Sequence, residues 1–242
     1  MTDDETKPSG LRQLKKRRTY EAVSDAAIAL FLERGFEKVS VAEVAAAAEI
    51  SKPTLFRYFP TKEDLVLHRF ADHEDEAARV VSGRPRDLSP LAALRAHFLA
   101  GLTRNDPVTG LNDAPEVLAF HQLLYGTPSL VARLYGYQER AERALAEALT
   151  EAPMEAPGEA EAGPTAEAAP ADPADPATPA TPVAPLAARL AAAQILATQR
   201  VLALENWRRV TAGEPVADVR ADAVRAANQA FGQLSSGLTR YA

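Results

Sequence analysis

The stretch SKPTLFRYFPTKED, residues 51–64, decides how the N-terminal part of this chain is interpreted. Ser51 is a typical helix N-cap, and Pro53 falls in the first turn after it, where the missing N–H of proline costs little. If the apolar residues Leu55 and Phe59 face inward, the other side chains of this short helix point outward. Those outward side chains are Lys52, Thr54, Arg57 and Tyr58. The stretch therefore predicts a short helix with a basic, aromatic outer face.

The residues before this stretch predict two more helices. The basic run Lys15–Arg18 opens the first helix, and Gly35 stops it in a C-cap position. Ser40 caps a short second helix, VAEVAAAAE, with Glu43 three residues later as its capping-box partner. A tight turn at Glu49 joins the second helix to the third. Together these two helices predict a helix-turn-helix.

The exposed tip of such a third helix fits the major groove of DNA, where side chains reach base edges. Arg57 can donate two hydrogen bonds to a guanine, and Thr54 can bond to a phosphate or contact a thymine methyl group. Tyr58 and Lys62 are expected to hold phosphates, as are the N-termini of the second and fourth helices. The run Lys15–Arg18 is expected to follow the backbone or enter a minor groove. The candidate DNA-binding residues are Lys15, Arg17, Arg18, Ser40, Ser51, Lys52, Thr54, Arg57, Tyr58, Thr61 and Lys62.

A plainer interpretation of the same residues stays open. A short, charged, aromatic helix can be a solvated face that carries two core aromatics. On either interpretation Phe56 is expected to pack rather than to contact DNA. The run Lys15–Arg18 is equally compatible with a solvated cluster of charges.

From Arg17 to Leu65 the chain resembles the DNA-binding domain of the TetR (tetracycline-repressor-like) family. The similar segments are LFLERGFEKVSV, VAAAAEIS and TLFRYFPTKEDL. The family's aromatic-x-aromatic-Phe step and its lysine at the start of helix four fall on Phe56, Tyr58, Phe59 and Lys62. Glu49 stands where the family usually has glycine, and a non-glycine residue in a left-handed turn costs about 1 kcal/mol. The resemblance implies a homodimeric repressor that a small-molecule effector releases from a palindromic DNA operator.

The whole chain is predicted to be all-α, with about nine helices. We expect a disordered tail at 1–10, the helix-turn-helix domain at 11–60, and a helical regulatory and dimerisation domain at 61–150 and 186–242. After the third helix, a fourth starts at Thr61 and runs toward Val81. The others are expected at about 88–104, 114–124, 128–150, 185–212 and 216–238.

Residues 151–185 differ from the rest in composition. They hold nine of the 18 prolines, no aromatic residue, and seven acidic residues with no lysine or arginine. Such a segment cannot bury enough apolar surface to fold, so we expect a disordered acidic linker. It is expected to be a spacer, and recruitment of a partner is the alternative. Without it the net charge of −6 becomes about +1, so the acidic composition does not argue against DNA binding.

The family resemblance also implies a ligand cavity among the middle helices and a dimer surface on the last two. The candidate cavity residues are His97, Phe98, Arg104, Phe120, His121, Leu124, Tyr125, Tyr135, Asn206 and Trp207. The candidate dimer residues are Val201, Leu204, Ala223, Ala227, Ala230, Phe231, Leu234 and Leu238. The alternative is that each set belongs to the ordinary core of a monomer.

Several classes of function are disfavoured. The chain has no cysteine, which excludes disulfides and thiolate chemistry and fits a cytoplasmic protein. No signal peptide and no apolar run of about 18 residues is readable, so no membrane span is expected. The four histidines do not form a metal-ligand pattern, and no nucleophile or phosphate-loop motif occurs. We therefore expect no enzyme, no metal and no cofactor.

Two alternative functions remain beside the ligand-released repressor. One is a ligand-independent DNA-binding protein that recruits partners through the linker. The other is a helical small-molecule-binding or catalytic protein whose N-terminal domain only packs. Binding to DNA separates the last from the other two, and a response to a ligand separates the first two from each other.

Overall fold

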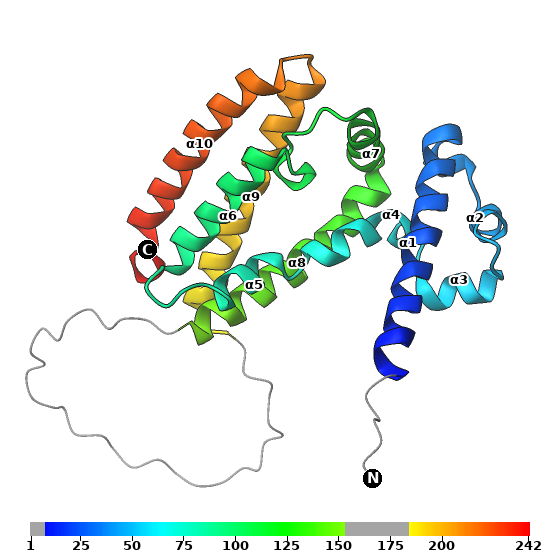
Figure 1. Cartoon of the computed structure of the whole chain (residues 1–242), viewed down its shortest axis with the longest axis horizontal. Coiled ribbons are helices and arrows are strands. Elements are labelled where there is room, and N and C mark those ends of the chain that lie inside the picture. The colour runs from blue at the N-terminus through cyan, green and yellow to red at the C-terminus, as the bar shows by residue number, and fades with distance from the viewer. Residues whose placement is uncertain (1–7, 153–183) are drawn as a thin grey trace, which may run out of the picture.

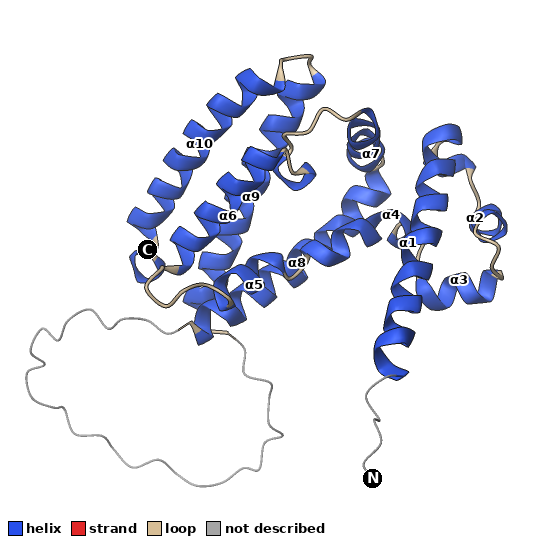
Figure 2. Cartoon of the chain, viewed as in Figure 1, coloured by secondary structure: helices blue, strands red, loops and turns tan. Residues whose placement is uncertain are grey.

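The structure is a computed structural model that describes residues 8–152 and 184–242. Within those residues it has ten α-helices, four 3₁₀ helices and no strand (Figure 1, Figure 2). The all-α prediction is therefore confirmed, with one more α-helix than the nine expected. Residues 1–7 of the expected tail lie outside the described residues. Residues 8–10 were also expected in the tail, but they are helical.

The N-terminal elements are those predicted. They are α1 (Pro8–Arg34), η1 (Phe36–Lys38), α2 (Val41–Ala47) and α3 (Lys52–Tyr58). Gly35 ends α1 with φ +90°, a backbone angle that favours glycine. Phe31 on α1, Leu55 on α3 and Phe59 just after α3 are almost fully buried. Figure 1 shows α2 and α3 on the side of α1 that faces away from α6, α9 and α10.

The expected single helix from Thr61 toward Val81 is wrong. Three short elements replace it: α4 (Asp64–Leu67), η2 (His68–His73) and α5 (Glu76–Ser82). The segment serves different packing partners along its length, because α4 packs on both α1 and α8 whereas α5 packs on α6 and α8. A 3₁₀ stretch, η2, therefore stands between the two short α-helices.

The regulatory helices agree with the predicted ranges to within a few residues. They are α6 (Pro90–Arg104), α7 (Pro115–Gly126), α8 (Pro128–Glu151), α9 (Leu186–Thr211) and α10 (Val216–Gly237), with η3 (Pro107–Thr109) and η4 (Thr239–Tyr241). Of the predicted linker 151–185, only the ends belong to the described residues: Glu151 ends α8, and Pro185 precedes α9. None of the described helices is both long and apolar enough to cross a membrane.

Two apolar cores hold these elements. One lies among α5, α6, α8, α9 and α10 and contains Leu94, Ile195 and Phe231. The other contains Phe31 and Leu55 of the helix-turn-helix domain together with residues of α4, α7 and the start of α8. The second core therefore continues past residue 60, the boundary expected from the sequence, and ties the DNA-binding domain to the regulatory helices.

Candidate nucleic-acid interface and regulatory cavity

Local hydrogen bonds fix the start of α2. The backbone N–H of Glu43 donates to Ser40 Oγ at 3.2 Å, and the backbone N–H of Ser40 donates to Glu43 Oε2 at 2.8 Å. This is the predicted capping box. The bonds from Ser40 and from Arg34 lower the pKa of the Glu43 carboxyl to about 2. The carboxylate is therefore charged, and it stabilises the helix end, at any ordinary pH.

The turn between α2 and α3 has the expected left-handed residue. Glu49 has φ 54°, and Ile50 donates its backbone N–H to the carbonyl of Ala45 at 2.9 Å. A glutamate in this left-handed backbone conformation is strained, whereas a glycine would not be. The turn retains the helix-turn-helix geometry in spite of this strain.

Helix α3 presents its basic side chains outward. Ser51 Oγ accepts the backbone N–H of Thr54 at 3.3 Å and lies 2.8 Å from Thr54 Oγ1, which fixes the first turn. Leu55 is fully buried, and its burial sets the rotation of the helix. Lys52 and Arg57 are exposed, and Thr54 is half-buried at the rim. These three residues are accessible from solvent, and their contact with DNA stays a prediction.

Other candidates make contacts within the protein. Lys62 Nζ donates to the backbone carbonyl of Phe36 and lies 4.2 Å from the centroid of the Phe36 ring. Tyr58 packs edge-on against Tyr20, with ring centroids 4.9 Å apart. Thr61 Oγ1 accepts the backbone N–H of Asp64, the first residue of α4, whose N-cap position is Glu63 rather than the predicted Thr61. A phosphate role for Lys62 or Tyr58 stays a prediction and is weakened by these contacts.

The basic run on α1 is partly engaged. Arg17 pairs with Glu21 at 3.5 Å, and Lys16 lies 5.7 Å from the ring of Tyr20. Arg18 is exposed. The side chain of Lys15 lies outside the described part of the structure.

An ion pair joins α4, which packs on α1 of the helix-turn-helix domain, to the regulatory helix α8. The guanidinium of Arg133 on α8 donates to both carboxylate oxygens of Asp64 on α4, at 2.9 and 3.1 Å. Asp64 is almost fully buried. The same carboxylate accepts the backbone N–H of Thr61 at 3.1 Å. A shift of α8 would therefore be felt directly at the start of α4.

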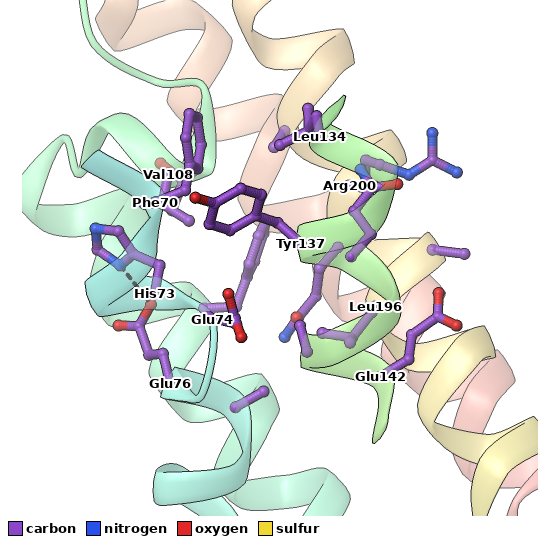
Figure 3. Close-up of a pocket in the computed structure, with 18 of the residues that line it drawn as sticks. Phe70, His73, Glu74, Glu76, Val108, Leu134, Tyr137, Glu142, Leu196 and Arg200 are labelled. Atoms are coloured by element: carbon purple, nitrogen blue, oxygen red, sulfur yellow. Dashed lines mark hydrogen bonds and ion pairs between the residues drawn. The ribbon is translucent and has the colours of Figure 1, made fainter. Parts of the chain in front are cut away.

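One cavity has a volume of about 360 Å³ and lies among η2, α5, α6, η3, α8 and α9 (Figure 3). Figure 3 shows Tyr137 reaching from α8 toward Phe70 and Val108, with the Glu74 carboxylate beneath it. The guanidinium of Arg200 points away from the cavity. Among the ten residues expected here, His97, Phe98, Tyr125 and Tyr135 line the cavity.

Apart from His97, the polar wall of this cavity was not expected from the sequence. Glu76 hydrogen-bonds His73 Nδ1 at 2.8 Å and His97 Nε2 at 2.9 Å. The bond from His73, followed by that from His97, holds the pKa of the Glu76 carboxyl below its ordinary value. Burial raises the pKa of Tyr137, so this hydroxyl is neutral at physiological pH. In the sequence, the i, i+3 spacing of His73 and Glu76 is the one signal for their pairing.

The other six expected residues lie elsewhere, which corrects the predicted cavity. Phe120 and His121 line a second cavity of about 440 Å³ between α1, η2, η3 and α7. Leu124 is fully buried in the core. The remaining three are Arg104, which is exposed, Asn206, which donates to the carbonyl of Thr109, and Trp207, whose ring packs against His121 and Tyr125. Among the described residues, no group of acidic and histidine side chains is arranged to hold a metal ion.

The expected dimer surface also needs correction. Ala223, Ala227 and Phe231 fill the core of the chain itself, so α10 uses them to pack on its own neighbours. Ala230, Leu234, Leu238 and Leu204 are half-buried. Val201 on α9 is 60% exposed, and Leu190 on the same helix and Tyr135 on α8 are also exposed. Among the described residues of the α-helices α5 to α10, the exposed large apolar side chains lie on α8 and α9.

Comparison with known proteins identifies the N-terminal domain. Residues 23–68 match the family model described as bacterial regulatory proteins, tetR family. The transcriptional regulator TcmR of Streptomyces glaucescens is 33% identical over 139 residues, which cover 57% of this chain and 61% of TcmR. The transcriptional regulator RutR of Escherichia coli K12 is 28% identical over 138 residues, which cover 56% of this chain and 62% of RutR. The chain thus spans about three fifths of the length of these relatives.

A solved structure of Salmonella enterica GusR aligns along nearly the whole chain. The alignment covers 98% of this chain and 100% of GusR, with 17% sequence identity and a TM-score of 0.49.

Proposed function

We propose that this chain, which belongs to the TetR family of bacterial regulatory proteins, is a sequence-specific DNA-binding transcriptional regulator. In the full proposal it is a homodimeric repressor that a small molecule releases from a palindromic operator. The observation that carries the proposal is the outward tip of α3, where Lys52 and Arg57 are exposed beside a buried Leu55. In the same proposal, residues 61–150 and 186–242 regulate and dimerise this DNA-binding domain.

The proposed DNA contacts are of two kinds, contacts to base edges and contacts to phosphates. Arg57 reads a guanine, because a guanidinium can donate two hydrogen bonds to one base edge. Lys52 and Thr54 flank it, and Arg17 and Arg18 on α1 add phosphate contacts that position the domain without specifying sequence. A single α3 covers few base pairs, which favours a two-fold dimer on a palindromic site.

The dimer is proposed to form through α8 and α9. Leu190, Val201 and Tyr135 are large apolar side chains exposed on these two helices. Exposed apolar groups on two adjacent helices suit an isologous helix–helix contact.

The effector is proposed to bind the cavity of about 360 Å³ that lies between α5, α6, α8 and α9. Its walls combine the rings of Phe70, Phe98 and Tyr137 with the polar groups of Glu76 and His97. Such a lining suits a largely apolar molecule with a few hydrogen-bonding groups. Release follows if the bound form disfavours the half-site spacing, which is a population shift between two states. The Asp64–Arg133 pair is the proposed link between cavity helices and DNA-binding domain.

The test is selection from a random double-stranded DNA pool at about 150 mM salt, because salt sets the non-specific background. Wild type, Arg57→Ala and the matched control Arg86→Ala are compared; Arg86 is an exposed arginine on the loop between α5 and α6. A palindrome enriched by wild type and Arg86→Ala, but not by Arg57→Ala, supports the proposal.

The other outcomes select among the alternatives. No enrichment from a folded, dimeric protein would favour a helical small-molecule-binding protein without DNA binding. Enrichment with no release by any compound in a screen would favour a ligand-independent DNA-binding protein.

A further inference from the structure

We infer that Phe56 reads the 5-methyl group of a thymine in the major groove. It is then a specificity-determining residue beside Arg57. The inference rests on the proposed function of binding DNA. It also replaces the sequence-based expectation that Phe56 packs within the protein.

The exposure of Phe56 sets it apart. All eight phenylalanines of the chain lie in the described residues, and Phe56, at 41%, is the one classed as exposed. It belongs to neither of the two apolar cores formed by the described residues. Its neighbours Leu55 and Phe59 are 0% and 2% exposed. The ring is thus an apolar group held in solvent by a helix whose other large apolar residue is buried.

The position of the ring on α3 is fixed rather than incidental. Successive helical residues are about 100° apart, so the burial of Leu55 turns Phe56 away from the core. Lys52 is four residues earlier on the same face, and its Nζ lies 5.9 Å from the centroid of the Phe56 ring. The cap made by Ser51 and Thr54 holds the first turn of the helix. Phe56 therefore shares the proposed DNA-facing surface with Lys52.

The chemistry of the ring narrows what it can contact on DNA. A phenyl group has no polar atom, so it cannot hydrogen-bond a phosphate or a base edge. The apolar group that a base edge presents in the major groove is the thymine 5-methyl group, which aliphatic and aromatic side chains contact. Burying one methyl group is worth about 0.8 kcal/mol, which corresponds to about a fourfold change in affinity.

The experiment uses the palindrome selected by the full-length wild-type protein. Each thymine of one half-site is replaced in turn by deoxyuridine, which removes only the 5-methyl group, and the same change is made in the other half-site. Dissociation constants are measured by fluorescence anisotropy at fixed salt for wild type, Phe56→Ala, Phe56→Leu and Lys52→Ala. Thermal unfolding of each variant shows that it is folded.

For wild type we expect about a fourfold weaker affinity per half-site at one thymine position, and no change at the others. Phe56→Ala should bind the thymine and uracil sites equally at that position, whereas Phe56→Leu should keep part of the difference. Lys52→Ala should lower the affinity for the thymine site and for the uracil site by the same factor.

Two results would overturn the inference. One is a wild-type protein that tolerates every uracil within twofold. The other is a Phe56→Ala protein that loses the same factor as wild type at the sensitive position. Both differ from failure of the proposed function, in which no palindrome is selected in the first place.

Discussion

Asp64 of α4 and Arg133 of α8 form a two-bond ion pair that fixes α4, which also packs on α1, against α8, with N–O distances of 2.9 and 3.1 Å. The Asp64 side chain is 7% exposed and that of Arg133 is 43% exposed, so the carboxylate depends on this partner more than the guanidinium does. Because the pair joins residues 69 positions apart in the sequence, it stabilises the packing of α4 on α8 rather than a single helix.

Removing the guanidinium of Arg133 should therefore destabilise the fold and weaken the packing of α4 on α8. We expect Arg133→Gln to lower the free energy of unfolding by about 1–3 kcal/mol, since a buried carboxylate loses its charged partner but keeps the bond from Thr61. Arg133→Lys should have a stability between those of wild type and Arg133→Gln, because a lysine keeps the charge but not the two-bond geometry. Urea unfolding measures this, and Arg143→Gln, at an exposed position of α8, is the control. A loss no larger than in the control would contradict the assigned role.

The turn of the helix-turn-helix offers a stabilising substitution. Glu49 has φ 54°, a conformation that glycine adopts without penalty. We expect Glu49→Gly to raise the free energy of unfolding by about 0.5–1 kcal/mol, with a higher melting temperature. Glu49→Ala removes the same charge but keeps the left-handed strain, so it should gain nothing. Equal effects of the two substitutions would show that charge, not backbone strain, is responsible.

Close approach of η3 to α9 predicts a strongly destabilising change. Gly110 has φ +72°, and a Cβ atom there would lie 1.9 Å from the carbonyl oxygen of Ala203. Gly110→Ala should lower the free energy of unfolding by about 2–4 kcal/mol, because both the backbone angle and the contact oppose a side chain. Gly232→Ala on α10, where nothing lies within 4 Å, should instead stabilise by up to about 1 kcal/mol. Thermal unfolding measures both variants, and equal changes in their melting temperatures would refute this account.

The Glu76 carboxylate predicts a particular dependence of stability on pH. The hydrogen bond from His73, and then that from His97, keeps its folded pKa below the ordinary 4.5. A carboxyl with a lowered folded pKa stabilises the fold above about pH 4.5 and loses that contribution as pH falls through the folded pKa. Glu76→Gln should therefore reduce the free energy of unfolding by about 1–2 kcal/mol at pH 7 and should flatten its decline between about pH 5 and 3.

Urea unfolding over that pH range measures both effects. Glu116→Gln, at an exposed position of α7, serves as the control and should keep the wild-type profile. A decline as steep in Glu76→Gln as in wild type would mean that Glu76 does not carry the pH dependence.

Local signals made the DNA-binding domain predictable. The hydroxyl hydrogen bonds of Ser40, Ser51 and Thr61 each involve a residue three positions away, so the sequence contains both partners. The cavity depends on residues far apart instead: Glu76 and His97 are 21 positions apart, and their contact exists only after α5 packs on α6. The break of the expected fourth helix has the same origin, because two different packing partners act on one segment.

The stripe on α10 shows a second limit of the sequence pattern. Ala223, Ala227 and Phe231 recur at helical spacing, which indicates a buried face but not what buries it. In the structure this face packs on the chain's own core, whereas the large apolar residues that the regulatory helices α5 to α10 expose lie on α8 and α9. Periodicity cannot separate an intramolecular core from a dimer surface, since both remove the same side chains from water.

This relocation yields the final prediction, which concerns the dimer. Val201 is 60% exposed on α9, so a charged side chain there costs the isolated chain almost nothing but would be buried in an interface. We expect Val201→Glu to shift the protein from dimer to monomer by light scattering at micromolar concentration, with an unchanged melting profile of secondary structure. Operator affinity should fall at least tenfold, because one α3 tip then binds without its partner. Leu32→Glu, at an exposed position of α1 away from α9, should leave the dimer intact. A Val201→Glu protein that remains dimeric would place the interface on another surface, and the half-buried Leu234 and Leu238 at the end of α10 would then be the next residues to substitute.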